Sequence, residues 1–302
     1  MAAPHKLVFV VATKDRPDEL CRMWRSLVSQ SRLPDEVVIV DASARPFPLD
    51  GLEPASIVLR YLRTGMASAT RQRNLGLDAA APDVDLVGFL DDDVVLEDGA
   101  VETMLRFWEG ADAGVGGAAF NMANHPPLDW PFLKRTRLAE SLGLYAPRGG
   151  AVTPSGFQTM IGRLTDTAWA DWLPSGASVW RRTIFRDYRF DEWFGGYSYL
   201  EDLDFSYRVG RRHRLAVVAS ARYLHLPAAG GRGNGYVFGL REVVNRVHFV
   251  RKYPEFSLRK CYAALAVRLL MNVAFAARDG KAAYLGRAWG NAVGLAKSAA
   301  RL

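Results

Sequence analysis

Three adjacent carboxylates, Asp91, Asp92 and Asp93, end an apolar run in the segment GFLDDDVVL (88–96). Carboxylates at such short range repel one another unless a cation neutralises them. Mg²⁺ and Mn²⁺ prefer oxygen ligands, and a bound Mg²⁺ is commonly shared between one or two carboxylates and substrate phosphates. The run therefore predicts a site where a divalent cation meets a nucleoside diphosphate.

The alternative for these acids is a helix cap, because acids favour the first turn of a helix. A helix is predicted at 98–109, and Glu97 and Asp98 suit its capping. The acids of 91–93 come before any predicted helix, so capping explains them poorly. We favour the cation site.

A second group of carboxylates lies among aromatic residues in YLEDLDFSYRVGRRHR (199–214). Apolar neighbours desolvate a carboxylate and raise its pKa, as a general base requires. Glu201 and Asp202 are the candidates. On a helix, however, Asp204 and Arg208 would form an ion pair four residues apart. Taken alone, the segment fits a salt-bridged helix start equally well.

Two weaker signals follow from single residues. Gly176, in PSGASVWRR (174–182), would allow a backbone to approach a ligand closely. His225, in YLHLP, lies among apolar residues, where a histidine more often belongs to the core than to a metal site.

Alternating apolar runs and helical patterns position these residues. Strands are predicted at 7–13, 36–43, 55–62 and 85–93, and helices at 17–30 and 68–80. This order predicts an α/β fold with a mostly parallel central sheet flanked by helices. Functional groups then belong at the carboxyl ends of the strands, where Thr13 and Asp41 also lie.

In chain order, the motifs VVATKDRP, VVIVDAS, RQRNLGL, FLDDDVVL, PSGASVWRR, LEDLDF and YLHLP resemble the family 2 glycosyltransferases of the GT-A fold, in particular rhamnosyltransferase-like bacterial members. The resemblance covers about residues 5–226. FLDDDVVL resembles the DxD motif of the family. LEDLDF, followed by Arg208 and Gly210, resembles its xED region, and PSGASVW resembles the glycine loop that precedes it.

The resemblance implies an inverting, metal-dependent transfer of a sugar from a UDP-, dTDP- or GDP-sugar to an acceptor hydroxyl. It assigns the catalytic base to Asp202 and acceptor orientation to Glu201. Asp93 and His225 would hold the Mg²⁺ or Mn²⁺ ion. The residues expected to bind the nucleotide sugar are Thr13, Asp15, Asp41, Arg71, Arg73, Asn74, Asp91, Asp92 and Gly176.

Two irregular segments belong to the expected substrate region. The segment 121–168 matches no pattern except a short helix near 132–144, and the resemblance places acceptor specificity there. The glycine-rich stretch 228–235 resembles a loop that folds over the diphosphate, where Arg232 would meet its charge.

The C-terminal region is predicted to be helical and basic, which divides the chain into a catalytic domain at 4–235 and a helical region at 236–302. Residues 251–302 carry ten Lys and Arg against two acids, whereas the other 250 residues carry 29 bases and 30 acids. On a helical wheel of 282–299, Arg287 and Asn291 lie opposite Leu285 and Trp289.

No uncharged stretch in this region exceeds nine residues, so no membrane-spanning helix is expected. The amphipathic pattern predicts binding of 255–302 to a membrane surface, with a lipid-linked or cell-envelope glycan as acceptor. The enzyme would then be cytoplasmic and peripheral on the inner face of the cytoplasmic membrane. The alternative is that the apolar face packs on the catalytic domain or on a second subunit.

The composition limits the other classes of function. The 302 residues are 49% apolar and 24% charged, which excludes a disordered or collagen-like chain, and the two cysteines imply no disulfide framework. A nucleic-acid-binding protein would explain the net charge of +7, but no reader motif or stacking platform is present. A non-catalytic nucleotide-sugar-binding module remains a second alternative. The sequence carries no signature of oligomeric state.

Overall fold

The computed structural model describes residues 5–49, 52, 56–125, 136–141, 143–196, 198–227 and 234–300. These residues form two compact units. The sheet unit combines the described residues of 1–127 and 161–228, and the helical unit combines those of 128–160 and 229–302. The described residues of 128–160, which were predicted to belong to the catalytic domain, thus group with the C-terminal helices. The division into a catalytic domain at 4–235 and a helical region at 236–302 stays a prediction.

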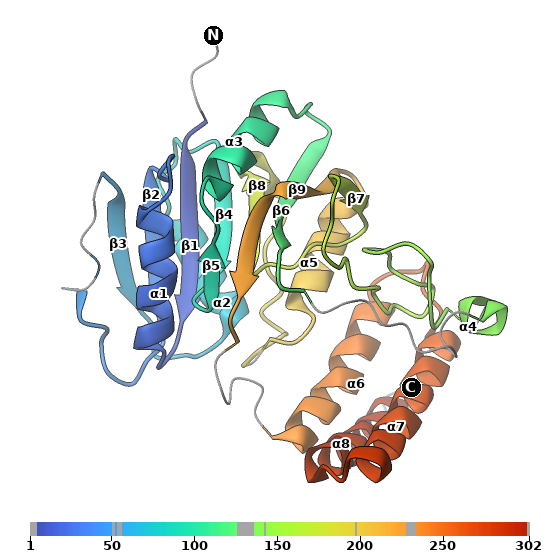
Figure 1. The fold of residues 1–302 in the computed structure, drawn as a ribbon. Coiled ribbons are helices and arrows are strands. Elements are labelled where there is room, and N and C mark those ends of the chain that lie inside the picture. The colour runs from blue at the N-terminus through green and yellow to red at the C-terminus, as the bar shows by residue number, and fades with distance from the viewer. Residues whose placement is uncertain are drawn as a thin grey trace. The chain divides into compact units, whose positions relative to one another are not determined.

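The sheet unit is built on a mixed sheet in the order β3-β2-β1-β4-β8-β6-β9-β5, with β7 paired to β9 (Figure 1). The strands are β1 (Leu7–Thr13), β2 (Glu36–Asp41), β3 (Val58–Arg63), β4 (Leu86–Asp91), β5 (Val94–Leu96), β6 (Val115–Met122), β7 (Ala168–Ala170), β8 (Ala177–Arg181) and β9 (Arg214–His225).

The first four of these strands are parallel, as predicted, and the sheet becomes mixed beyond them. β1 pairs in parallel with both β2 and β4, and β2 with β3. β1, β2 and β4 are buried almost throughout because they are apolar on both faces. β3 lies at the sheet edge and is half-exposed.

One strand prediction needs correction. The segment 214–226 is expected to be a strand, a turn and a short strand, but β9 is one strand of 12 residues. Where the turn was expected, the register between β9 and β6 shifts, between the pairs Phe120–Val218 and Asn121–Arg222. The shift bends the strand without ending it.

Helices cover both faces of the sheet. α1 (Pro17–Val28) and α3 (Ala100–Gly110) pack on one face through Trp24 and Trp108, and α2 (Ala69–Ala79) and α5 (Glu201–Gly210) cover the other. α1 begins at a proline, which suits the first turn of a helix. A 3-10 helix, Arg182–Arg186, completes the second face.

The helical unit contains α4 (Arg137–Ser141), α6 (Gly235–Arg251), α7 (Leu258–Asp279) and α8 (Ala282–Ala299). The Asn234 side chain caps α6 by accepting a hydrogen bond from the Val237 amide. The Ser257 side chain caps α7 by accepting one from the Lys260 amide. Of the helix predicted near 132–144, the structure describes 137–141 as helical, and 132–135 lie outside the described residues.

The apolar face of α8 was predicted to bind a membrane surface or else to pack on the protein. In the structure Leu285 and Trp289 of this face are 57% and 65% exposed, whereas Asn291 of the polar face is fully buried. The periodicity identified the two faces correctly, but it does not state which of them meets the rest of the unit.

The sequence predicted no membrane-spanning helix, but the structure contains one candidate. By length and composition alone, α7 is apolar enough to cross a bilayer. A core helix of a water-soluble protein passes the same test, but such a helix is mostly buried. Only 28% of the apolar window of α7 is buried.

Candidate active site

The predicted carboxylates gather at one edge of the sheet unit. Thr13, Asp41 and Asp91 end the neighbouring parallel strands β1, β2 and β4, where Thr13 pairs with Asp41 and Asp91 pairs with Ala12. His225 ends β9 and pairs with Val94, two residues after Asp92. The order of the strands therefore brings together residues that lie more than 200 positions apart.

Asp91 is held by two fixed contacts. Its carboxylate accepts a hydrogen bond from Arg73 Nη2 at 2.8 Å, and its backbone amide donates to the Gly176 carbonyl at 2.8 Å. A Cβ on Gly176 would lie 2.7 Å from Asp91 Oδ2. Only glycine leaves room for this carboxylate, which gives Gly176 a role in positioning Asp91.

Arg73 links two of the predicted acids. Its Nη1 donates to Glu201 Oε1 at 2.9 Å, and its Nη2 donates to Asp91. The side chain is buried and lies over the Phe190 ring. Burial acts to lower the pKa of Arg73, but the two carboxylates outweigh it and raise the pKa above the usual value. The guanidinium is therefore permanently charged.

Glu201 and Asp202 form the first turn of α5, and both have raised pKa values. Burial is the main cause for each, and the charge of Asp202 raises the pKa of Glu201 further. The backbone before them is unusual, since Ser198 and Leu200 adopt left-handed φ values of 49° and 76°. Such conformations in non-glycine residues cost free energy and concentrate at functional sites.

Asp92 is buried and held from the other side of the acid run. It accepts hydrogen bonds from Thr13 Oγ1 at 2.8 Å and from Arg16 Nη1 at 2.9 Å. Burial raises the pKa of Asp92 to about 6, although Arg16 and Thr13 oppose the shift. The contact with Thr13 occupies the hydroxyl of a residue that was predicted to bind the nucleotide.

Asp93 and His225 lie together, as their predicted role requires. Asp93 Oδ1 is 3.3 Å from His225 Nε2. That oxygen is buried and accepts no hydrogen bond from the residues that the structure describes. A buried, unsatisfied carboxylate oxygen beside an imidazole nitrogen suits a divalent cation.

Within the described ranges, no group of three or more His, Cys, Asp and Glu residues converges on one point. Asp93 and His225 would therefore supply two ligands, and a diphosphate and water the others, which is usual for Mg²⁺. The residues present fit the ion on these terms.

Two arginines reduce the repulsion between Asp91, Asp92 and Asp93 that was expected to require a cation. Arg73 pairs with Asp91, and Arg16 pairs with Asp92 and lies 3.6 Å from Asp93. The protein itself thus balances much of the charge that was expected to need a metal. The case for a cation now depends on Asp93 Oδ1 and His225, rather than on the three acids as a group.

Asp41 and Asp15 organise the loops beside the acids. Asp41 accepts hydrogen bonds from the Ser43 amide at 2.7 Å and the Tyr61 hydroxyl at 2.5 Å. Burial acts to raise the pKa of Asp41, but these hydrogen bonds outweigh it and lower the pKa. Asp15, with a φ of 53°, accepts from the Ala44 amide at 3.0 Å. Both carboxylates join the segments that follow β1 and β2.

Two predicted nucleotide ligands have other partners. Asn74 bonds to both the amide and the carbonyl of Phe190 and donates to Glu192 Oε1, so its side chain fastens the segment before α5. Arg71 Nη1 lies 3.3 Å from Met66 Sδ. The structure does not bring Asn74 or Arg71 to the acids that Arg73 joins.

Sequence reasoning missed Arg16 and Gln72. Gln72 is buried and donates to the Thr13 and Val40 carbonyls at 2.9 and 2.8 Å, which ties α2 to the ends of β1 and β2. Arg16 lies in the KDRP segment that was used for the resemblance, but its contact with Asp92 spans 76 positions. No local pattern announces such a pairing.

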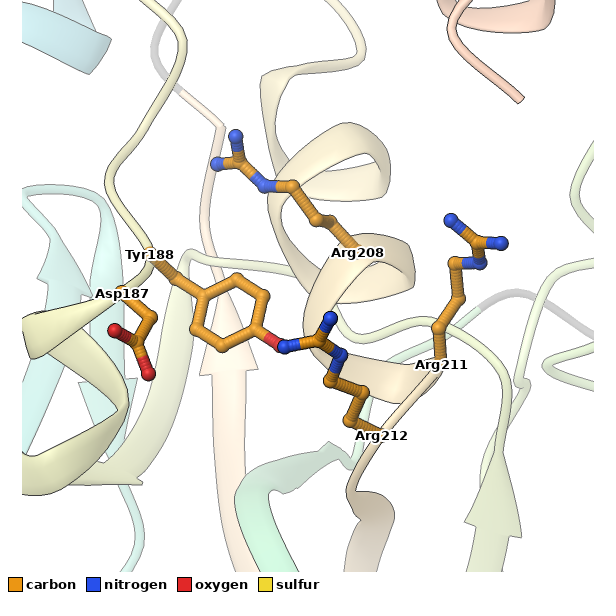
Figure 2. A pocket seen from close by; sticks show the side chains of 5 residues that line it. All are labelled: Asp187, Tyr188, Arg208, Arg211 and Arg212. Atoms are coloured by element: carbon orange, nitrogen blue, oxygen red, sulfur yellow. The ribbon is translucent and has the colours of Figure 1, made fainter.

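A cavity of about 360 Å³ lies at the other end of α5 (Figure 2). Arg208, Arg211, Arg212, Tyr188 and Asp187 line it. These cations surround the helix C-terminus, where they stabilise the helix dipole. Arg208 lies seven residues after Glu201 on α5, so about 10 Å of helix, at 1.5 Å per residue, separates this cavity from Glu201.

The fold is that of a GT-A glycosyltransferase. The profile described as "Glycosyl transferase family 2" matches residues 8–165, which is more than half of the chain. The chain belongs to this family and is a glycosyltransferase.

Solved structures of S. aureus TarS are similar in fold. The structure of its residues 1–349 has a TM-score of 0.52 and 16% identity over 86% of this chain and 69% of that chain. The same fragment in complex with UDP has a TM-score of 0.52 and 16% identity over 90% of this chain and 72% of that one. No curated protein sequence matches the chain.

Proposed function

We propose that this glycosyltransferase moves a sugar from a nucleoside-diphosphate sugar to an acceptor hydroxyl with inversion of configuration. The observation that carries the proposal is the chain of contacts from Asp91 through Arg73 to Glu201, which couples the end of β4 to the desolvated carboxylates at the start of α5. The donor would be a UDP-, dTDP- or GDP-sugar. The UDP complex of a TarS fragment supports a donor of this class.

The donor would lie along the carboxyl ends of β1, β2 and β4. Thr13 and Asp41 flank the place proposed for the base, and Asp91 that for the ribose. Asp91 retains Oδ2 for a donor hydroxyl, because its contact with Arg73 uses Oδ1. Gly176 keeps the space around Oδ2 open.

Asp202 is the proposed general base. Its raised pKa strengthens it as a proton acceptor relative to an ordinary aspartate. The acceptor hydroxyl would attack the anomeric carbon opposite the leaving diphosphate and give its proton to Asp202. The new glycosidic bond forms as the bond to the diphosphate breaks, so no covalent enzyme intermediate is needed. Glu201, fixed by Arg73, would orient the acceptor.

Asp93 and His225 are the residues proposed to hold a divalent cation. When bound, Mg²⁺ or Mn²⁺ neutralises charge that develops on a leaving diphosphate. Arg16 adds a fixed positive charge at the same edge, 3.6 Å from Asp93.

The proposed acceptor is a lipid-linked or cell-envelope glycan, and the enzyme would act in the cytoplasm at the inner face of the membrane. The basic residues of 251–302 support a place beside an anionic surface. Acceptor specificity is proposed to reside in 121–168, of which 126–135 and 142 lie outside the described residues. Arg232 and its glycine-rich neighbours at 228–233 also lie outside them.

Hydrolysis of candidate donors tests the proposal without knowledge of the acceptor. The wild-type protein is incubated with UDP-, dTDP- and GDP-sugars, with Mn²⁺ or with EDTA, and the released sugar is followed by proton NMR. We expect slow release of the sugar from one class of donor, and the sugar that is released first should have the inverted anomeric configuration. Release with retained configuration from the preferred donor would contradict the proposed mechanism.

A further inference from the structure

The outer surface of the helical unit is apolar along two neighbouring helices. On α7, Val267, Leu270 and Val273 are 39%, 65% and 45% exposed, and on α8 Leu285 and Trp289 are more than half exposed. Small apolar residues are exposed between them on α7: Ala263, Ala266, Ala274 and Ala277. These residues form what we call the outer stripe. Their spacing of three and four residues makes each helix apolar along one continuous outward face.

A cluster of polar side chains lies inside the same unit, beside buried apolar residues such as Val243 and Leu265. Glu242 of α6 is 1% exposed and accepts hydrogen bonds from Arg268 of α7 and Arg287 of α8 at 3.0 and 2.7 Å. Asn291 donates to Glu242 and to the Gly239 carbonyl, and accepts from Asn272. Charged and amide groups therefore join the three helices inside the unit, while the outer stripe lies on its surface.

Glycines bring α6 and α8 into close contact. α8 carries Gly286, Gly290 and Gly294 at intervals of four residues, and α6 carries Gly235 and Gly239 at the same interval. A Cβ on Gly239 would overlap the Arg287 carbonyl oxygen, and one on Gly290 would overlap that of Tyr236. Packing of this kind, backbone against backbone, is typical of helices in lipid.

An exposed apolar stripe over a buried cluster of ion pairs is unusual for a helical unit in water. In lipid, helices associate through small residues and interhelical hydrogen bonds, and ionisable side chains face one another inside the bundle. We propose that the outer stripe of α7 and α8 contacts the acyl chains of a phospholipid bilayer. This inference goes beyond the peripheral surface binding of the Proposed function and does not depend on the catalytic roles.

The charges at the ends of the helices support lipid as the occupant. Arg259 and Lys260 precede the outer stripe of α7, and Arg278 and Lys281 follow it. The 17 residues between Lys260 and Arg278 are about 25 Å of helix, close to the roughly 30 Å of the hydrocarbon core. Anionic headgroups would complement these cations, whereas a second copy would bring like charges together.

Flotation with vesicles of phosphatidylcholine and phosphatidylglycerol (3:1) tests the contact. We expect the full chain to float and to stay bound in 1 M NaCl, because apolar contact is not screened by salt. The double variant Leu270→Glu/Leu285→Glu should lower the floated fraction at least tenfold. Val58→Glu, at an exposed apolar position of the sheet unit that is 56% exposed, should float like the wild type. Complete release of the wild type by salt would overturn the proposal.

Trp289 gives a second readout that does not require a destabilising change. Vesicles with acyl chains brominated near the headgroup end should quench part of the tryptophan emission, and Trp289→Phe should remove most of that quenching. A wild-type protein that does not float and forms a discrete dimer, dissociated by Leu270→Glu/Leu285→Glu, would assign the stripe to a second copy instead. Donor hydrolysis, measured without vesicles, reports on the catalytic proposal separately.

Discussion

The two units of this glycosyltransferase satisfy buried charge in opposite ways. In the sheet unit a buried cation, Arg73, lies between two carboxylates, Asp91 and Glu201. In the helical unit a buried carboxylate, Glu242, lies between two cations, Arg268 and Arg287. The first arrangement leaves an excess of negative charge and raised carboxylate pKa values at the edge of a sheet. The second leaves no reactive group and fastens three helices to one another.

The comparison shows that a buried ion pair is not by itself a sign of chemistry. What distinguishes the sheet unit is backbone strain beside an unsatisfied carboxylate. Ser198 and Leu200 adopt left-handed backbone conformations before the acids of α5, and Asp93 Oδ1 accepts no hydrogen bond from the described residues. In the helical unit Glu242 is instead paired with Arg268 and Arg287, and the outer stripe is apolar. The predictions below separate the two cases.

Replacing the proposed base should have the largest effect. Asp202→Asn keeps the shape of the side chain but cannot accept a proton, so the rate of sugar transfer should fall by about 10²–10⁴. Donor binding, measured by calorimetry, should stay within about twofold of the wild type. Transfer at the wild-type rate would remove Asp202 from the mechanism.

Arg73→Gln should destabilise the sheet unit. The change leaves Asp91 and the partly buried Glu201 without the buried cation that they share. Breaking a buried pair costs about 3–5 kcal/mol, and because the Asp91 side chain is 38% exposed, we expect the lower end of this range. The charge of Arg73 also lowers the pKa values of Glu201 and Asp202. Its loss should move the acid limb of the kcat/KM profile to higher pH. Arg106→Gln, which removes an exposed ion pair with Glu102, is the control and should change the free energy of urea unfolding by less than about 1 kcal/mol.

Glu242→Gln is the mirror experiment in the helical unit. It leaves Arg268 and Arg287 facing a neutral amide and should destabilise α6–α8 by a similar amount, about 3–5 kcal/mol. Hydrogen exchange should show this loss in 235–299 and leave protection of β1, β2 and β4 unchanged. Faster exchange in those strands would mean that the two units do not unfold separately.

Gly176→Ala should have a smaller effect on folding. The new Cβ would lie 2.7 Å from Asp91 Oδ2, and overpacking of this kind costs about 1–3 kcal/mol. Because the clash displaces the proposed ribose carboxylate, donor affinity should fall more than stability. Thermal unfolding and calorimetric titration with the donor nucleotide measure the two effects. Unchanged donor affinity would place the ribose elsewhere.

A pH dependence of stability is expected from Asp92. Its folded-state pKa of about 6 exceeds the ordinary value of 3.8, so the folded state binds the proton more tightly than the unfolded state. The free energy of unfolding should therefore fall as pH rises from about 4 to about 6, by no more than about 1.4 kcal/mol per pH unit. The difference between wild type and Asp92→Asn, measured by urea unfolding, isolates this contribution. A difference that does not vary with pH would exclude the raised pKa.

The fold was largely predictable from the sequence because apolar runs and turn residues are local signals. The boundaries of β1 and the starts of β2 and α1 follow from them, whereas the predicted strands 36–43 and 85–93 end two residues later than β2 and β4. The continuity of β9 was not predictable, since the pairing with β6 that extends it involves residues about 100 positions away. The sequence left the orientation of α8 open for a physical reason: periodicity separates two faces, and the surroundings decide which face is buried.

The site was predictable only in part. The acids at the ends of strands and at the start of α5 were found because their residue types are unusual beside apolar runs. Their partners were not, because Arg16 and Arg73 reach Asp92 and Glu201 only through the fold. The same limit explains Asn74, whose neighbour in sequence, Arg73, joins the acids while Asn74 fastens the 190–192 segment.

Calorimetric titration of UDP, dTDP and GDP with and without Mn²⁺ is the most direct test of the central claim that Asp93 and His225 couple a cation to the donor diphosphate. The account predicts that one nucleotide binds the wild type at least tenfold more tightly with Mn²⁺, and that Asp93→Asn abolishes this gain while leaving metal-free binding unchanged. Binding to the wild type that is equally tight with Mn²⁺ and with EDTA, or a full Mn²⁺ effect in Asp93→Asn, would contradict it.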